Sequence, residues 1–208
     1  MPYIVTAPWW LRLTFSRHCV WDIPHKEKEL YLTFDDGPHP TITPRVLDLL
    51  KAYQAKATFF CIGKNVEAYP DIYRRIIQEG HRVGNHTYSH LNSKETDEDV
   101  WLEDVKKATA WIDSDLFRPP YGRISRFQEK TLREAKPGFR TMLWSVLSGD
   151  FDKKLSGADC TKIVCKHSKP GSIIVFHDSE KAWPRLEFCL PEILKRLSDK
   201  GFSFKVLK

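Results

Sequence analysis

Two histidines four residues apart, His86 and His90, and two adjacent aspartates, Asp35 and Asp36, are the residues best suited to chemistry in this chain. Two imidazoles and a carboxylate are a ligand set used by catalytic zinc, with a fourth position left for water or substrate. If the histidines share a helical turn, their Cβ atoms lie about 5–6 Å apart, which suits one ion. A further carboxylate beside them can act as a base.

Each motif also has an ordinary structural explanation. His-x-x-x-His occurs in polar loops whose imidazoles bind nothing, and Asp35-Asp36-Gly37-Pro38 is rich in residues that form turns. Successive side chains on a strand point to opposite sides, so the two aspartates are not expected to act on one atom. One carboxylate can therefore bind a metal while its neighbour points elsewhere in the pocket.

The segment Arg118-Pro119-Pro120-Tyr121-Gly122 is a stiff loop. Its prolines fix the backbone, and the permanently charged Arg118 can hold a carboxylate ionised and oriented. The backbone N–H of Tyr121 can donate to an oxyanion. A purely structural turn is the alternative.

Three more residues are candidates. His177 follows the apolar run 173–176, where a lone histidine is usually structural, but it is predicted to lie near the other polar residues. Asp150 can tune His177 or Arg118, and Trp144 can form a pocket wall. Both also have ordinary loop or core explanations.

From residue 28 onward, strand-like apolar runs alternate with helical patterns. Strands are predicted at 29–34, 57–62, 81–85, 115–118, 139–145, 172–176 and 203–207. Helices are predicted at 43–53, 70–79, 95–113, 126–136, 158–168 and 185–200. The alternation predicts a single α/β domain with a parallel sheet, either open or closed into a barrel, and residues 1–28 as an extension packed on residues 29–208.

The polar candidates share one position in this pattern, because each follows a predicted strand. In parallel α/β folds the loops at the carboxyl ends of the strands build the active site. All the candidates are therefore expected on one rim, which favours a single site over scattered structural residues.

Composition excludes several other functions. With 208 residues, 41% hydrophobic and 29% charged, the chain can form one soluble domain. The net charge is +6, but the basic residues are scattered and usually lie close to acidic ones, so no nucleic-acid partner is predicted. The five cysteines form no Cys-x-x-Cys and are expected to be reduced and mostly buried. The start of the chain resembles neither a signal peptide nor a membrane span, so a cytoplasmic location is expected.

Five motifs in order resemble those of the polysaccharide deacetylases, the NodB-homology group of carbohydrate esterase family 4. The resemblance runs from about residue 29 to 206. The motifs are Thr33-Phe34-Asp35-Asp36-Gly37-Pro38, Asn85-His86-Thr87-Tyr88-Ser89-His90, Arg118-Pro119-Pro120-Tyr121-Gly122, Trp144 to Phe151, and Val175-Phe176-His177.

The resemblance implies a distorted (β/α) barrel of about seven parallel strands. It implies one divalent metal, usually zinc with cobalt as a possible substitute, on Asp36, His86 and His90. It assigns Asp35 as the catalytic base and His177 as the acid.

The same resemblance implies that Arg118 orients the base and that Asp150 belongs to the charge network. Pro120, Tyr121 and Trp144 are expected on the substrate and oxyanion side. The fourth motif departs from the family pattern Asp-x-x-Asp-Trp, since Leu147 and Phe151 replace its first and last residues. The resemblance places these two positions at one wall of the substrate site, so that wall is expected to differ from the family pattern.

The function implied is metal-dependent removal of N-acetyl groups from glycans that contain N-acetylglucosamine, of the peptidoglycan or chitin type, by a monomer. An O-acetyl esterase acting on a polysaccharide such as xylan is one alternative. A non-catalytic glycan-binding relative is another, and a phosphoesterase or nuclease would need a second metal.

Overall fold

The structure is a computed structural model and describes residues 4–24, 26–136 and 138–208. Its strands are β1 (Glu29–Asp35), β2 (Ala57–Cys61), β3 (Arg82–Asn85), β4 (Leu116–Phe117), β5 (Arg140–Thr141), β6 (Val146–Leu147), β7 (Ile173–His177) and β8 (Ser203–Phe204). Its helices are α1 (Trp9–Arg12), α2 (Ile42–Ala52), α3 (Gly63–Ala68), α4 (Pro70–Gln78), α5 (Glu98–Ala108), α6 (Arg126–Glu134), α7 (Gly157–His167) and α8 (Trp183–Asp199), with a 3₁₀ turn η1 (Pro120–Gly122).

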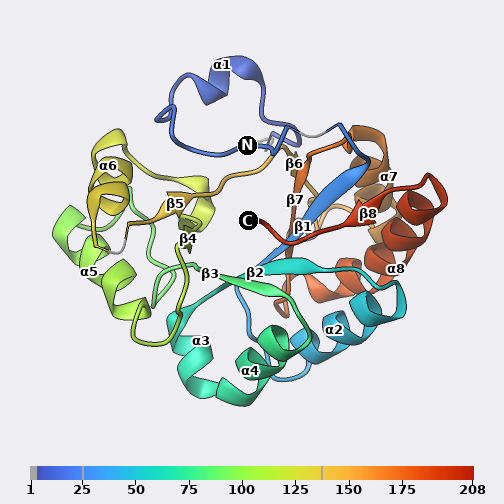
Figure 1. The fold of residues 1–208 in the computed structure, drawn as a ribbon, viewed down its shortest axis with the longest axis horizontal. Coiled ribbons are helices and arrows are strands. Elements are labelled where there is room, and N and C mark those ends of the chain that lie inside the picture. Colours follow the sequence, from blue (N-terminus) through green and yellow to red (C-terminus); the bar gives the residue numbers. More distant parts are fainter. Residues whose placement is uncertain (1–3, 25, 137) are drawn as a thin grey trace.

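The strands form one parallel sheet in the order β5-β4-β3-β2-β1-β7-β6, and β8 pairs with the start of β1. The sheet is curled, and the helices from α2 to α8 surround its outer side (Figure 1). This confirms the prediction of a single α/β domain built as a distorted barrel with about seven parallel strands.

Strand β1 shows how the sequence gives the barrel two apolar layers. Alternate side chains of a strand point to opposite faces. Phe34 faces the helices and stacks on Phe59 at 5.0 Å and on Phe176 at 5.5 Å between ring centroids. Tyr31 faces the barrel interior, where it belongs to a smaller apolar cluster. Because both faces are covered, β1 is apolar almost throughout instead of alternating with polar residues.

The predicted strand 139–145 is wrong, because only residues 140–141 of it form a strand, β5, and the next strand, β6, begins at residue 146. These two strands are the edges of the sheet. Residues 142–145 cross between those edges. The N–H of Met142 donates to Phe117 O at 2.8 Å, and the N–H of Ser145 donates to Ile173 O at 3.1 Å. The backbone therefore changes its pairing partner from the β4 side to the β7 side, which a continuous strand cannot do.

Other differences are smaller. The predicted helix 95–113 is shorter, as α5, while α1, α3 and η1 were not predicted. Short helices carry too few periodic residues to be recognised. Gly80 and Gly201, which follow α4 and α8, have φ of 78° and 79°, in the left-handed region that helix C-caps use.

The N-terminal segment lies over the crossing residues 142–145, beside β5 and β6 (Figure 1). Thr6 forms an antiparallel bridge with Val146, and Val20 forms a parallel bridge with Met142. Trp21 packs with Leu143 and half-buried Trp144 in a separate apolar cluster. The segment therefore covers the seam between the two edge strands. The division into domains at residue 28 stays a prediction.

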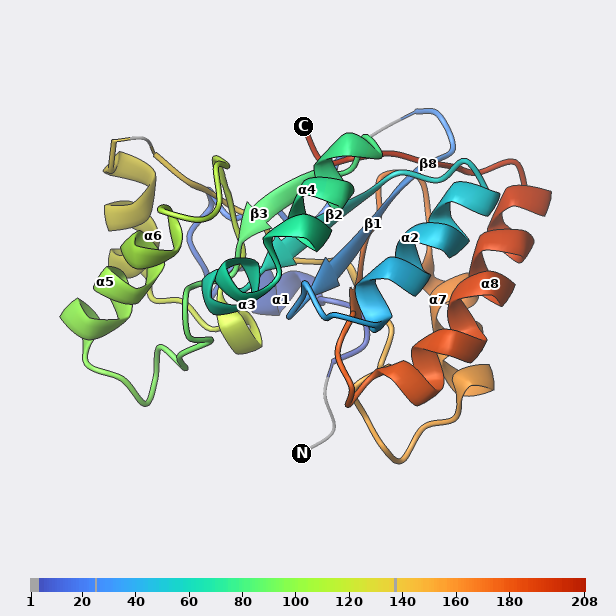
Figure 2. The ribbon, with the colours of Figure 1, turned by 90° about the horizontal axis from the view of Figure 1, so that it is seen from below.

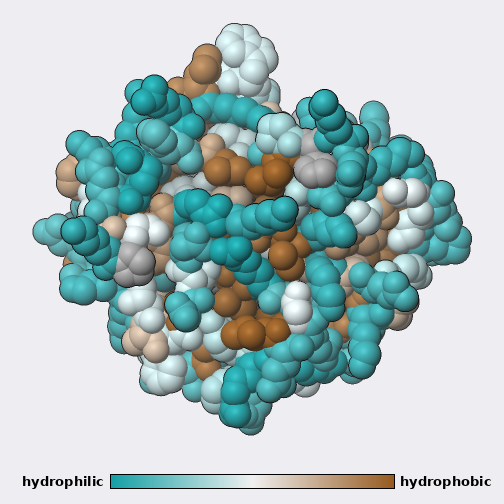
Figure 3. Space-filling model, in the orientation of Figure 1, coloured by the Kyte–Doolittle hydropathy of each residue, from teal (hydrophilic) through white to brown (hydrophobic). Residues whose placement is uncertain are grey.

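The strands run in one direction, so their carboxyl ends meet at one end of the barrel (Figure 2). Figure 3 shows the opposite end as mostly hydrophilic, with hydrophobic residues toward its centre. Lys56, Lys205 and Lys208 border a shallow pocket there. Among the described residues no helix has the length and apolar character needed to cross a membrane. Cys19, Cys61, Cys160 and Cys189 are buried thiols, and Cys165 is half-buried.

The packing of the N-terminal segment predicts unequal effects of two tryptophan substitutions. Trp21 is 7% exposed and its ring lies edge-on to Phe15 at 5.1 Å, whereas Trp9 is 74% exposed. Trp21→Ala should lower the free energy of unfolding by about 3–5 kcal/mol, as for other buried tryptophans. Trp9→Ala should change it by less than about 0.5 kcal/mol. Urea unfolding monitored by circular dichroism measures both, and equal effects would contradict the packing described.

Candidate active site

The predicted rim residues lie together at the carboxyl ends of the strands. Asp35 is the last residue of β1 and is directly paired in register with His177, the last residue of β7. His86 follows β3, Arg118 follows β4, and Asp150 lies just beyond β6. The N–H of Asp178 donates to Asp35 O at 3.1 Å, which extends the β1–β7 pairing into the loop.

Asp36, His86 and His90 form a compact group of potential metal ligands. One ligand atom from each residue lies within 4.8 Å of the others. The Oδ1 atom of Asp36 is 3.8 Å from His86 Nε2 and 3.3 Å from His90 Nε2. One carboxylate and two imidazoles at this separation match the donor set that zinc binds, with a position left open.

The environment of His86 prepares it to be a ligand. Its Nδ1 atom is 2.7 Å from the carbonyl oxygen of Arg118, which can only accept, so Nδ1 carries the proton and Nε2 offers its lone pair. Burial lowers the pKa of His86 to about 4, which keeps the ring neutral at pH 7. These residues therefore fit a divalent metal.

Asp36 is suited to the same role as an ionised ligand. Its partial burial opposes ionisation, but the hydrogen bond from His90 and the charges of His177 and His86 outweigh that effect. The pKa of Asp36 is consequently lowered below its usual range. A carboxylate that stays charged is the form a cation binds.

The candidate ligands come from loops with unusual backbone conformations. Among the described residues, five other than glycine have positive φ, and four of them belong to the site motifs: Asp36, Thr87, His90 and Tyr121. Such conformations are costly for residues with a Cβ and are concentrated at functional sites. The segment 86–90 is thus an irregular loop, not a helical turn, although its two imidazole centroids are 5.1 Å apart.

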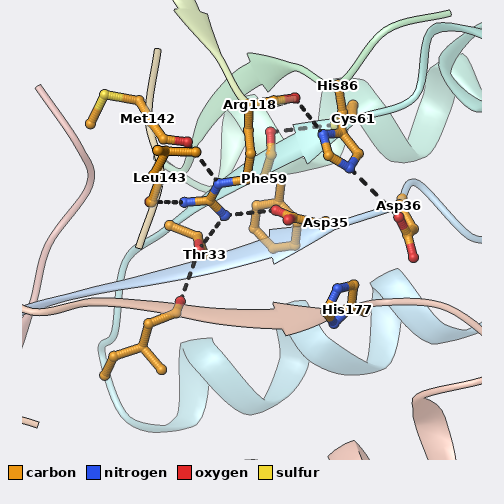
Figure 4. Close-up of polar contacts among 12 residues, drawn as sticks. Thr33, Asp35, Asp36, Phe59, Cys61, His86, Arg118, Met142, Leu143 and His177 are labelled. Carbon is orange, nitrogen blue, oxygen red and sulfur yellow. Dashed lines mark hydrogen bonds and ion pairs between the residues drawn. The ribbon is translucent and has the colours of Figure 1, made fainter. Parts of the chain in front are cut away.

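Arg118 fixes the orientation of Asp35. The guanidinium is 1% exposed, and its Nη1 donates to Asp35 Oδ1 at 2.7 Å. Its Nε and Nη2 donate to the carbonyls of Met142 and Leu143 at 3.1 and 3.0 Å. The plane also stacks on Phe60 at 4.1 Å. Figure 4 shows Asp35 turned toward Arg118 and Asp36 turned toward His86.

His177 is held by Asp150, and no hydrogen bond or ion pair joins Asp150 to Arg118 within the described residues. Asp150 is fully buried, and its Oδ1 lies 2.8 Å from His177 Nδ1. Its Oδ2 accepts the backbone N–H of His177 at 2.7 Å. Burial opposes protonation of the imidazole, but the charge and hydrogen bond of Asp150 raise the pKa of His177 to about 9. His177 is therefore protonated at neutral pH.

The Pro120–Gly122 turn lies against the metal group. The ring of Tyr121 is exposed and packs on His90 at 4.8 Å between centroids. Gly122 has φ of 62° and lies against Trp144, since a Cβ there would be 2.1 Å from the indole. Trp144 therefore supports the turn from behind, and its role as a wall for substrate stays a prediction.

Three further residues make contacts in the site that were not predicted from the sequence. The Thr33 hydroxyl lies between Arg118 Nη1, at 2.6 Å, and Ile174 O, at 2.8 Å. The carboxylate of Asp178 accepts the N–H of Gly37 at 3.1 Å and so fixes the loop that carries Asp36. Phe151 packs edge-on to His177 at 5.3 Å. Thr33 could have been found in the sequence as a polar residue within an apolar strand. The contacts of Asp178 and Phe151 depend on tertiary geometry.

The arrangement separates three chemical functions. Asp36, His86 and His90 converge on one point, Asp35 lies beside it as a second carboxylate, and a protonated imidazole lies on the neighbouring strand. A metal-bound water, a base and an acid in such proximity suit hydrolysis of an acyl derivative.

Comparisons with known proteins agree with this chemistry. The polysaccharide deacetylase family profile matches residues 22–137. A peptidoglycan-N-acetylglucosamine deacetylase of Bacillus cereus is 39% identical over 193 residues, which cover 90% of each chain. The peptidoglycan-N-acetylmuramic acid deacetylase PdaA of Bacillus subtilis is 35% identical over 86% of this chain and 70% of its own.

A solved structure gives the same result for the fold. It is a crystal structure of a peptidoglycan N-acetylglucosamine deacetylase in complex with an N-hydroxybenzamide derivative. It superposes with a TM-score of 0.82 at 34% identity, over 96% of this chain and 94% of that one. The profile match spans more than half of the chain, and the relatives cover nearly all of it. The chain therefore belongs to the polysaccharide deacetylase family.

Proposed function

We propose that this protein is a metal-dependent hydrolase that removes N-acetyl groups from N-acetylglucosamine residues of peptidoglycan and releases acetate. The observation that carries the proposal is the separation of the two adjacent aspartates. Asp36 lies 3.3 Å from His90 in the metal group, and Asp35 lies 2.7 Å from Arg118 outside it. The relatives named above, which deacetylate peptidoglycan by name, support the choice of substrate.

Asp36, His86 and His90 are proposed to hold zinc. When bound, the ion supplies a Lewis acid that polarises the acetyl carbonyl and lowers the pKa of a water molecule. His86 presents its unprotonated Nε2 for this purpose because its Nδ1 carries the proton and donates to the Arg118 carbonyl. The two remaining ligands come from the loops after β1 and β3.

Asp35 is proposed to accept a proton from the attacking water. The ion pair with Arg118 orients the carboxylate and directs Oδ1 to the guanidinium, so Oδ2 is left for the water. Arg118 cannot turn away, since the Met142 and Leu143 carbonyls and the Thr33 hydroxyl accept its other donors.

His177 is proposed to give its proton to the departing amine. An amine leaves poorly unless it is protonated, and the pKa of His177, about 9, keeps the imidazolium populated at neutral pH. Water thus adds to the carbonyl carbon, Asp35 takes one proton, and the carbon–nitrogen bond breaks as His177 protonates nitrogen. The products are acetate and a free glucosamine unit.

The backbone N–H of Tyr121 is proposed to donate to the developing oxyanion. The packing of the Tyr121 ring on His90 places its main chain beside the metal group. Pro120 and the Gly122–Trp144 contact limit the movement of this turn. A hydrogen-bond donor that is already in position before the reaction stabilises the negative charge of the oxyanion without reorganisation of the protein.

Acetate release tests the function directly. The purified protein, loaded with zinc, should release acetate from N-acetylated peptidoglycan. Chelation should abolish the release, and added zinc or cobalt should restore it. An enzyme-coupled acetate assay measures each step, with acetylated xylan as the comparison for O-acetyl esterase activity. Activity on xylan alone would contradict the proposal.

Two aspartate variants serve as internal controls for this assay. Asp35→Asn should keep bound metal and lose roughly 10²- to 10⁴-fold in kcat, the usual contribution of a general base. Asp36→Ala should lose the metal as well, measured by elemental analysis of the dialysed protein. Full activity of Asp35→Asn would remove the base assignment.

The buried Asp150 also makes pH dependence a test. Since its charge raises the pKa of His177 to about 9, activity should fall as pH rises through that value. Asp150→Asn removes the charge and should shift the alkaline limb of the kcat/KM profile to lower pH. The acidic limb should stay near that of the wild type. An unchanged alkaline limb would show that His177 is not the acid or that Asp150 does not tune it.

A further inference from the structure

The loop that joins β7 to α8 places a cation beside the catalytic acid. The ring of Phe151 lies edge-on to His177 at 5.3 Å between centroids. On Phe151 lies Lys181, whose Nζ is 5.8 Å from the ring centroid. The lysine side chain is exposed. The same ring therefore lies close to both the cation and the imidazole of His177.

The main chain of Lys181 is fixed relative to the catalytic acid. Arg185, which is 9% exposed, donates from Nη2 to the Lys181 carbonyl and from Nε to the Asp150 carbonyl at 2.5 Å. Asp150 in turn holds both the ring and the backbone N–H of His177. One buried guanidinium therefore ties the position of the cation to that of the acid.

The charge of Lys181 is available to an external anion. Across the described part of the chain, none of the ion pairs involves Lys181. The neighbouring Glu180 is directed elsewhere, with its Oε1 atom 3.5 Å from His39 Nε2. Lysine carries a compact charge on a flexible stem, which can follow a mobile partner.

We propose that Lys181 binds a carboxylate of the substrate and makes the enzyme prefer a peptide-bearing, anionic glycan to a neutral one. The proposal rests on the function proposed above and names the substrate class for it. Peptidoglycan carries peptides with free carboxylates on the sugar next to N-acetylglucosamine, whereas chitin-type chains carry none. The position of Lys181, beside the ring that also packs on His177, suits a group on a sugar adjacent to the one that reacts.

The expected effect is modest because the lysine is exposed. A solvent-exposed ion pair corresponds to roughly a two- to fivefold change in affinity. It is weakened by salt, since the screening length falls to about 3 Å at 1 M ionic strength. The effect should therefore appear at low salt, and only with a charged substrate.

The experiment compares two soluble glycans of equal length, one a peptidoglycan fragment with its peptides and the other a neutral N-acetylglucosamine oligomer. Binding is measured by isothermal titration calorimetry and turnover by acetate release, each at low and high salt. The variant is Lys181→Gln. Lys205→Gln is the matched control, because it removes the same charge at the opposite end of the barrel.

Lys181→Gln should weaken binding of the anionic glycan and lower its kcat/KM roughly two- to fivefold at low salt, with no change for the neutral oligomer. Lys205→Gln should change neither. Equal losses on both glycans, a loss that persists at high salt, or no loss at all would overturn the proposal, and so would failure of the wild type to bind the anionic glycan. Binding without acetate release from either glycan would instead contradict the proposed function.

Discussion

The buried ion pair between Arg118 and Asp35 is the interaction on which the rest of the site depends. Arg118 reaches across the barrel interior and also hydrogen-bonds to Thr33 on β1 and to the carbonyls of residues 142 and 143. Its own carbonyl fixes the tautomer of His86. Removing one partner of such a pair leaves a buried charge, at a cost of about 3–5 kcal/mol. Asp35, His86 and the barrel seam are therefore all positioned by one residue.

The adjacent aspartates acquire different roles from the backbone that carries them. Asp35 is still in β1 and points into the barrel toward Arg118, as Tyr31 and Thr33 do from the same face. Asp36 has left the strand with φ of 81°, which turns its carboxylate toward the histidines. His177 lies on the adjoining strand β7, where the buried Asp150 keeps its imidazole protonated at neutral pH. His86 is neutral at the same pH. The two aspartates thus differ in orientation, and the two histidines differ in protonation state.

Much of this could be predicted from the sequence, for physical reasons. Long buried strands such as β1 and β7 have apolar runs that end in a polar residue, so the common rim of Asp35 and His177 was evident. The crossing at residues 142–145 was not, because Met142 and Leu143 are as apolar as strand residues and only their pairing partners differ. Whether Asp150 pairs with His177 or with Arg118 could likewise be decided only from the tertiary structure. The same holds for the position of Lys181 over Phe151.

The central claim is that Asp36 binds the metal while Asp35 remains outside it as the base. Anomalous diffraction from crystals of the zinc-loaded protein tests this most directly. We expect one ion bound by a carboxylate oxygen of Asp36 and by the Nε2 atoms of His86 and His90 at about 2.0–2.1 Å. Asp35 should remain paired with Arg118. An ion that takes Asp35 as a ligand, or that binds away from the two histidines, would contradict the account.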